Sequence, residues 1–336
     1  MTARVIPSVL CLGLVSSLIG CKARSLPKPP ASPAPPATVP ADISHGEAPI
    51  GVASSPPPVE AVAPAPSRER SHRVRLEISH TPITVDSGVR YNAWTFGGGV
   101  PGPFLRVRQG DTVDFTLVNR APMPHSMDFH AAEIAPSKYY VNVMPGDSIH
   151  YQFVARVPGV FMYHCGTAPV AAHIANGMYG ALIVDPATPR PAAREFVLVQ
   201  SEFYLTPADS AGHPRSLDWP KVLDQAPDYV VFNGRAAQYA KHPLPVRVGE
   251  LVRLYVVNAG PNRVSSFHVV GGIFERAFLD GSSTSPLSGV QTVLVPVGGG
   301  AIFELRLRQA GTYPFVTHAF ADATKGAVGV FEATEP

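Results

Sequence analysis

Cysteine and charge are both scarce in this chain. Of its 336 residues, three are cysteine and only 15% are Asp, Glu, Lys or Arg, with a formal net charge of +2. A charge so small and balanced gives no case for a nucleic-acid partner. Cys11 and Cys21 fall near the N-terminus and Cys165 stands alone in the remainder. No disulfide framework is therefore expected, and cysteine usage does not identify the cellular compartment.

The N-terminus carries the apolar run that a targeting segment needs. A basic start at residues 1–4 precedes an apolar stretch from Val5 to Gly20, which has signal-peptide length and is too short for a membrane span. The stretch ends in LIGC at Cys21, which resembles the bacterial lipoprotein signal, whose cysteine becomes the lipidated mature N-terminus. The alternative is an ordinary signal with a chance cysteine. We expect residues 1–21 to be a lipoprotein-type signal that sends the protein to the periplasm or cell envelope, anchored to a membrane by lipid on Cys21.

Proline dominates the next segment. Residues 22–70 hold about a third of the 37 prolines of the chain, with Ala, Ser and Val between them. Such a composition stays extended and cannot bury a core. We expect a disordered tether over residues 22–70 that holds the rest of the protein off a membrane.

From residue 71 onward, no long stretch has apolar residues at helical spacing. The sequence there consists of short β-rich runs separated by Pro and Gly turns. Only residues 168–176 are expected to form a short helix. This pattern occurs twice, since residues 244–260 are similar in sequence to residues 104–120, and residues 301–330 are similar to residues 148–184. The sequence therefore predicts an all-β protein with two tandem domains of one type, antiparallel sandwiches or barrels, over residues 71–190 and 191–336.

The stretch from Val160 to Gly180 gathers side chains that bind soft metals. It contains His164 and Cys165 side by side, His173 eight residues after the cysteine, and Met178. Two histidines, a cysteine and a weak axial methionine make a blue-copper site, so one more histidine is needed from PHSMDFHAA, residues 124–132. The alternative is that Cys165 is a small buried residue and the histidines are surface groups.

Strand geometry predicts how the two motifs combine. Alternation along residues 124–130 places His125, Met127 and Phe129 on one face, and Ser126, Asp128 and His130 on the other. His164 and Cys165 are adjacent and also face opposite ways. We expect Cys165 to join His125 inside the barrel and His164 to join His130 outside it, with Asp128 beside them. Two metal sites on the order of 10 Å apart would then be joined by one peptide link.

The second repeat keeps only part of this pattern. It has His318 where the first repeat has His164, but Ala319 where the first has Cys165, so it cannot build a blue-copper site. The outer pair of the first repeat needs a third ligand from a docked second domain, and His318 is the candidate. The alternative is that His318 is a core histidine beneath a turn, with its hydrogen bonds made inside its own domain.

Four motifs together resemble those of the copper-containing nitrite reductases: PHSMDFHAA, YHCGTAPVAAHIANGMYG, SSFHVVGG and VTHAFADATKGA. The resemblance runs from about residue 73 to residue 335. It implies two tandem Greek-key, cupredoxin-like β-sandwich domains and an enzyme that reduces nitrite to nitric oxide. The chain departs from the family at residues 133–138, where many members have a Gly-rich stretch.

The resemblance also implies the site residues and the partners. A type 1 copper would be held by His125, Cys165, His173 and Met178, a type 2 copper by His130, His164 and His318, and Asp128 and His268 would be catalytic. Each subunit would carry one copper of each type. The family resemblance further implies a homotrimer, in which His318 comes from a neighbouring subunit, and a small electron-donor protein, either a cytochrome c or a cupredoxin.

Three functions remain open from the residues. Nitrite reduction consumes one electron and two protons, which titratable groups such as Asp128 and His268 can deliver, although Asp128 could also serve only to orient a ligand. A two-domain laccase-like oxidase needs His-X-His pairs and a His-Cys-His triplet, and this sequence has neither. A non-catalytic electron-transfer protein would have no use for the outer histidines. His45 lies in the predicted tether and is expected to be a solvated side chain. Five other histidines match no motif and are expected to be ordinary: His72, His80, His150, His213 and His242.

Overall fold

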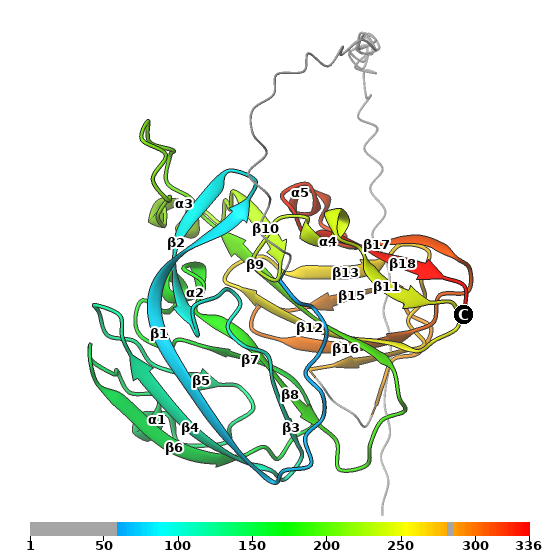
Figure 1. Cartoon of the computed structure of the whole chain (residues 1–336), viewed down its shortest axis with the longest axis horizontal. Coiled ribbons are helices and arrows are strands. Elements are labelled where there is room, and N and C mark those ends of the chain that lie inside the picture. Colours follow the sequence, from blue (N-terminus) through cyan, green and yellow to red (C-terminus); the bar gives the residue numbers. More distant parts are fainter. Residues whose placement is uncertain (1–58, 281–284) are drawn as a thin grey trace, which may run out of the picture. The chain divides into compact units, whose positions relative to one another are not determined.

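The computed structural model describes residues 59–280 and 285–336. The predicted signal peptide, Cys21 and most of the predicted tether lie outside these residues. Strands account for most of the regular structure, and the predicted all-β fold is confirmed (Figure 1). No helix among the described residues has the length and apolar character that crossing a membrane requires.

The first half of the described chain forms two four-stranded sheets. One has the order β2-β1-β4-β6, and the other has the order β3-β8-β7-β5. Their bounds are β1 Ser71–Asp86, β2 Val89–Phe96, β3 Leu105–Arg108, β4 Thr112–Asn119, β5 Asp128–Phe129, β6 Ser148–Val154, β7 Gly159–His164 and β8 Tyr179–Asp185.

The second half repeats this topology with one strand added to each sheet. The orders are β10-β9-β12-β16-β14 and β11-β18-β17-β13-β15. The parallel pair β1–β4 recurs as β9–β12, and the parallel pair β3–β8 recurs as β11–β18. The bounds are β9 Arg194–Phe203, β10 Tyr229–Phe232, β11 Leu244–Arg247, β12 Val252–Gly260, β13 Ser265–Val269, β14 Arg276–Leu279, β15 Thr292–Val295, β16 Gly300–Leu305, β17 Gly311–Thr317 and β18 Val328–Thr334. The repeat in the sequence is thus a repeat of strand order, while the boundary at residue 190 stays a prediction.

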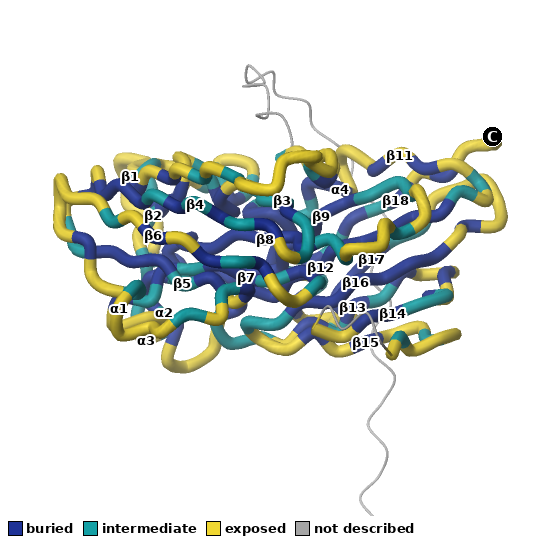
Figure 2. Tube along the Cα trace, turned by 90° about the horizontal axis from the view of Figure 1, so that it is seen from below, coloured by how far each residue is buried: buried dark blue, intermediate teal, exposed yellow. Residues whose placement is uncertain are grey.

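Strands β7 and β8 are buried on both faces, as the dark tube in Figure 2 shows. One face, which includes Tyr163 and Leu182, belongs to the core of the first sandwich. The other face, which includes Met162 and Ile183, packs against β9, β12 and β16 of the second sandwich. Apolar burial on both faces holds these strands in place, and the His164–Cys165 pair stands at the end of β7.

A buried ion network also ties the two sandwiches together. Arg106 of β3 donates to Asp185 at 2.7 Å and to Glu195 of β9 at 2.6 Å. Arg253 of β12 donates to the same Glu195 at 2.6 Å and to Glu304 of β16 at 2.7 Å. Because both guanidiniums are buried, loss of one partner would leave an uncompensated charge. The network therefore fixes β3 and β9 relative to each other.

Within residues 59–280 and 285–336, five short helices interrupt the strands: α1 Pro136–Tyr139, α2 Val170–Ala175, α3 Trp219–Leu223, α4 Gln238–Lys241 and α5 Phe320–Ala323. The helix expected within residues 168–176 is α2. The expectation that no other segment would be helical is wrong, because one-turn helices are too short to produce a hydrophobic period. In α3, for example, the Asp218 side chain accepts from the Lys221 amide and caps the turn.

The end of the predicted tether is ordered. Ala61 and Ala63 are buried against the second sandwich, where Val197 N–H donates to the Ala61 carbonyl and Ala63 N–H donates to the Glu195 carbonyl. The prediction of a disordered segment to residue 70 is therefore wrong for residues 59–66. Small alanine side chains can pack under a strand even in a proline-rich segment, since the backbone supplies the hydrogen bonds.

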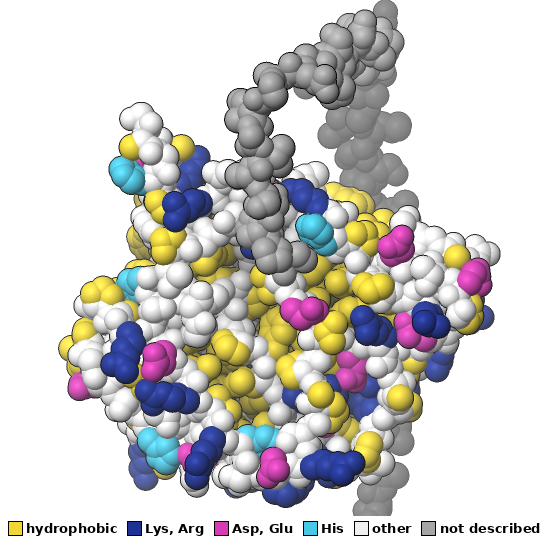
Figure 3. Space-filling view, in the orientation of Figure 1, with side chains coloured by type: hydrophobic (Ala, Val, Ile, Leu, Met, Phe, Trp, Pro, Cys, Tyr) yellow, Lys and Arg dark blue, Asp and Glu magenta, His cyan; other side chains and the backbone are white. Residues whose placement is uncertain are grey.

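Charged side chains of both signs are interspersed on the face drawn in Figure 3. No single-sign patch dominates that face, in keeping with the balanced charge of the sequence. Long-range steering of a polyanion such as nucleic acid would need such a patch.

Candidate metal centres

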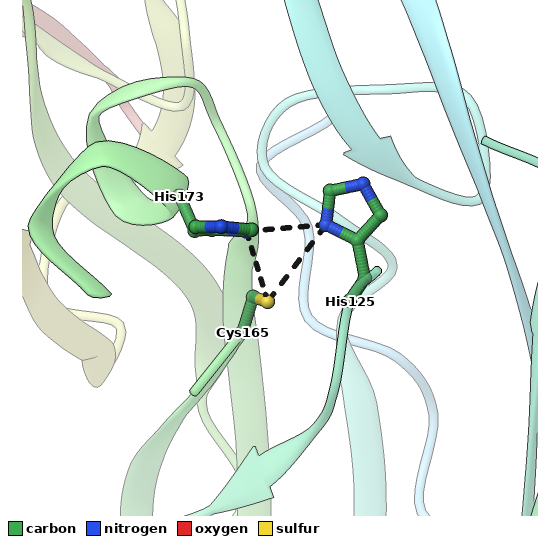
Figure 4. Close-up of side chains that lie close together, drawn as sticks. All are labelled: His125, Cys165 and His173. Atoms are coloured by element: carbon green, nitrogen blue, oxygen red, sulfur yellow. Dashed lines mark hydrogen bonds between the residues drawn. The ribbon is translucent and has the colours of Figure 1, made fainter. Parts of the chain in front are cut away.

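The first centre brings together one sulfur and two imidazole nitrogens (Figure 4). Cys165 follows β7, His173 lies on α2, and His125 lies in the loop before β5. The Cys165 Sγ lies 3.2 Å from His173 Nδ1 and 3.9 Å from His125 Nδ1, and the two Nδ1 atoms are 3.1 Å apart. All three side chains are buried. The predicted inner triplet thus converges on one point.

The backbone fixes the loop that carries this centre. Cys165 N–H donates to the Met178 carbonyl at 3.1 Å, and Met178 N–H donates to the His173 carbonyl at 3.2 Å. Met178 is fully buried in the first core beside Cys165. These bonds close the segment from the cysteine to the methionine into a compact unit, which holds the three predicted ligands Cys165, His173 and Met178 close together.

Ser126 contacts the sulfur of Cys165, and the sequence did not predict this contact. Its amide donates to Cys165 Sγ at 3.3 Å, and its hydroxyl accepts from the Gly166 amide at 3.0 Å. Strict alternation placed Ser126 on the outer face, and this prediction is wrong, because β5 begins only at Asp128 and the preceding residues are not in a strand. An amide aimed at a sulfur stabilises its thiolate form, which is the form that binds metal.

Burial keeps the inner imidazoles neutral. Desolvation, with the neighbouring imidazoles, lowers the pKa of His125 to about 3 and that of His173 to about 4. A neutral imidazole has a free lone pair, which is the form that coordinates a metal. Two such rings and a cysteine sulfur are the donor set of a soft, redox-active ion, so these residues fit copper.

The second centre lies on the other side of the same peptide link. His164 Nε2 lies 3.0 Å from His130 Nε2 and 3.7 Å from an Asp128 carboxylate oxygen. The other ring nitrogen of His164, Nδ1, donates to the Cys165 carbonyl at 2.9 Å. That bond fixes the tautomer, since a neutral ring with its proton on Nδ1 has its lone pair on Nε2. The predicted outer cluster is therefore assembled, and His164 is poised to bind a metal through Nε2.

The second sandwich carries a matching pair of histidines. In the first sandwich Phe129 of β5 pairs with Tyr163, the residue before His164, and in the second Phe267 of β13 pairs with Thr317, the residue before His318. His130 directly follows Phe129, and His268 directly follows Phe267. This register makes His318 the counterpart of His164 and His268 the counterpart of His130. The His268 and His318 rings meet edge to face with centroids 5.5 Å apart, as the rings of the first pair do at 5.0 Å. Neither belongs to the metal-binding clusters formed by residues 59–280 and 285–336 of one chain.

The segment that departs from the family forms α1 and brings a tyrosine to the second centre. The Tyr140 hydroxyl donates to the Phe129 carbonyl at 3.2 Å. Burial and the nearby Asp128 carboxylate raise the pKa of Tyr140. At this departure from the family a tyrosine lies beside Asp128, and no sequence motif predicted this contact.

His80 also has a place that the sequence did not predict. Its Nε2 lies 3.2 Å from His125 Nε2, and its ring stacks on Trp94. The expectation that His80 is an ordinary histidine is wrong. The pairing of β1 with β2 sets His80 opposite Trp94, and the fold brings His80 to His125, which lies 45 positions away in the sequence.

Comparisons with known proteins point to copper-containing proteins. The multicopper oxidase family model matches residues 77–189. A copper-containing nitrite reductase of Neisseria meningitidis is 41% identical over 263 residues, which span 76% of this chain and 67% of that protein. One from Pseudomonas chlororaphis is 33% identical over 295 residues, which span 79% of this chain and 78% of that protein.

A solved structure matches the fold as well. The copper nitrite reductase from Nitrosomonas europaea superposes with a TM-score of 0.73 at 39% identity, over 79% of this chain and 94% of that one. The match spans both sandwiches, so the two centres lie in a scaffold that this relative has as a whole.

Proposed function

Since this chain belongs to the family of copper-containing nitrite reductases, we propose that it reduces nitrite to nitric oxide with copper as its cofactor. The observation that carries this proposal is the pair of metal-binding clusters on either side of the His164–Cys165 peptide link. One cluster contains a sulfur and suits electron transfer, and the other is outer and oxygen- and nitrogen-rich, which suits an anionic substrate.

The residues divide into two ligand sets. Copper held by both sets would supply the redox chemistry: the first set would take up an electron from a small donor protein, a cytochrome c or a cupredoxin, and the second set would be the place where nitrite is reduced. The first set, for type 1 copper, is His125, Cys165, His173 and Met178, and the second, for type 2 copper, is His130, His164 and His318, with one ion of each type per subunit.

Two side chains supply protons. Nitrite, one electron and two protons give nitric oxide and water, so one nitrite oxygen must be protonated as its bond to nitrogen breaks. Asp128, whose carboxylate lies 3.7 Å from His164 Nε2, is placed to protonate that oxygen. His268 donates its Nδ1–H to the Gln291 carbonyl at 2.8 Å, which leaves Nε2 as the nitrogen that exchanges the second proton.

The second ligand set is completed between subunits. His318 is exposed and lies outside the cluster that contains His130 and His164. Two large apolar side chains in this region are exposed: Phe320, whose ring contacts the His318 ring, is 61% exposed, and Leu294, which pairs with Ser266 of β13, is 64% exposed. Exposed apolar side chains favour contact with a partner. In a closed homotrimer each subunit would cover this face of its neighbour, which gives three equivalent interfaces. Because His268 contacts His318, the same neighbour brings both residues to the site.

The alternatives have less support. A two-domain laccase-like oxidase would need His-X-His pairs and a His-Cys-His triplet, and the sequence has neither. A non-catalytic electron-transfer protein would not need a second centre flanked by Asp128 at all.

The cellular setting is part of the same proposal. A lipoprotein-type signal over residues 1–21 and a tether from residue 22 would hold two cupredoxin-like domains, at 71–190 and 191–336, on a membrane through lipid on Cys21. The support is the LIGC tetrapeptide and the proline-rich composition. A periplasmic or cell-envelope location gives access to exported electron-donor proteins.

A nitric oxide assay tests the proposed function. Full-length protein is loaded with copper, freed of excess metal and given a chemical reductant with nitrite, and nitric oxide is measured with an electrode. We expect nitric oxide that depends on both copper and nitrite, and none from the apoprotein. Oxygen consumption without nitric oxide would identify an oxidase instead and overturn the proposal.

A further inference from the structure

The first centre is covered by a stacked pair of rings. His80 of β1 stands directly opposite Trp94 of β2 in the antiparallel register, so both side chains lie on the same face. Their rings stack with centroids 5.1 Å apart and planes 11° from parallel. Trp94 also meets the His125 ring edge to face at 5.6 Å and the His173 ring at 4.9 Å. The pair therefore packs against both imidazoles of the first centre.

His80 makes a polar contact as well as this packing contact. Its Nε2 lies 3.2 Å from His125 Nε2, while His125 Nδ1 faces Cys165 and His173. His125 has no exposed surface, so water does not reach its Nε2. A neutral imidazole that offers the lone pair of Nδ1 must carry its proton on Nε2. That N–H is buried, and His80 Nε2 is the acceptor within reach.

We propose that His80 is a positioning residue for the first copper site. Its Nε2 accepts the hydrogen bond from His125 Nε2–H, which fixes the tautomer and the orientation of His125 so that Nδ1 points at the metal. The inference rests on the proposed function, because it requires copper at the first centre. His80 itself touches neither copper nor substrate.

The hydrogen bond has a measurable effect on the metal. An acceptor behind a metal-binding imidazole raises the basicity of the ring, and its loss costs about 10- to 100-fold in metal affinity. A more basic ligand favours the oxidised ion over the reduced ion. Loss of the acceptor should therefore raise the midpoint potential, and a tenfold change in relative affinity corresponds to about 59 mV for one electron.

Two variants separate this role from packing. His80→Phe keeps a ring to stack on Trp94 but cannot accept a hydrogen bond, whereas His80→Gln keeps an acceptor oxygen. His242→Phe, at an exposed histidine after α4, is the matched control for a histidine replaced elsewhere. The readouts on full-length, copper-loaded protein are the thiolate-to-copper absorption band, the copper affinity and the midpoint potential of the first site.

We expect His80→Phe to shift the band, to bind copper about tenfold or more weakly and to raise the potential, while His80→Gln and His242→Phe stay near the wild type. A His80→Phe protein with the band, affinity and potential of the wild type overturns the inference and leaves the proposed function intact. A wild-type protein without any thiolate-to-copper band instead overturns the assignment of the first site.

A direct measurement covers the case in which His80→Phe does not fold. Nitrogen NMR of the wild-type protein loaded with diamagnetic copper(I) reports which ring nitrogen of each histidine carries a proton. We expect the proton of His125 on Nε2, with a scalar coupling across the hydrogen bond to His80 Nε2. A His125 proton on Nδ1, or the absence of that coupling, contradicts the inference.

Discussion

Mixing two inactive variants is the sharpest test of the second centre. His318 is exposed at the end of β17, away from His130 and His164 of the same chain, so a complete ligand set needs two chains. His130→Ala removes a ligand from one side of each interface, and His318→Ala removes the ligand from the other side. Each variant alone should lose the second copper and the nitrite activity but keep the blue colour, because neither residue belongs to the first centre.

The yield of the mixture follows from counting interfaces. An interface is intact only when its first chain retains His130 and the following chain retains His318. After random reassembly of equal amounts of the two variants, each condition holds for about half of the chains, so about one quarter of the interfaces are complete. We expect about one quarter of the wild-type rate of nitric oxide formation. A ligand set within one chain predicts no activity, since no chain retains both histidines.

A second mixture serves as the control. Wild-type protein is mixed with the double variant His130→Ala, His318→Ala. Shared sites predict about one quarter of the full activity in the mixture, whereas sites within one chain predict about one half. Two affinity tags on the two kinds of chain verify by mass spectrometry that mixed assemblies have formed. Verified mixed assemblies with no activity in the first mixture, or a monomeric active enzyme, would refute the shared-site reasoning.

The other predictions concern the first centre, the proton donors and the anchor. Cys165→Ala should abolish the thiolate-to-copper band while the second centre still binds copper, and an unchanged visible spectrum would contradict its role as a ligand. Asp128→Asn and His268→Ala should each slow turnover about 10²- to 10⁴-fold with both coppers bound, and near-normal rates with saturating reductant would remove both residues from the mechanism. Cys21→Ser should give a soluble exported protein in place of a membrane-bound one, and a soluble wild type without an acyl group on Cys21 would exclude the lipid anchor.

The sequence by itself determined the fold class and most of the chemistry. Short β-rich runs, Pro and Gly turns and the internal repeat indicated two β sandwiches or barrels, because these signals are local and occur in both halves of the chain. Adjacent residues on a strand must face opposite ways, so the His164–Cys165 pair, taken together with His125 and His130, indicated two centres on either side of one peptide link. The predicted inner triplet of His125, Cys165 and His173 converges in the structure for this reason.

Only the tertiary structure decided which side chains surround these centres. His80 of β1 reaches His125, 45 positions away in the sequence, and Tyr140, just after α1, reaches the Phe129 carbonyl beside the second centre. Ser126 turns toward Cys165 because the strand begins two residues later than alternation assumes. Such contacts join residues far apart in the sequence and depend on register and on loop geometry. No local period encodes either property, so they are fixed only when the sheets pack.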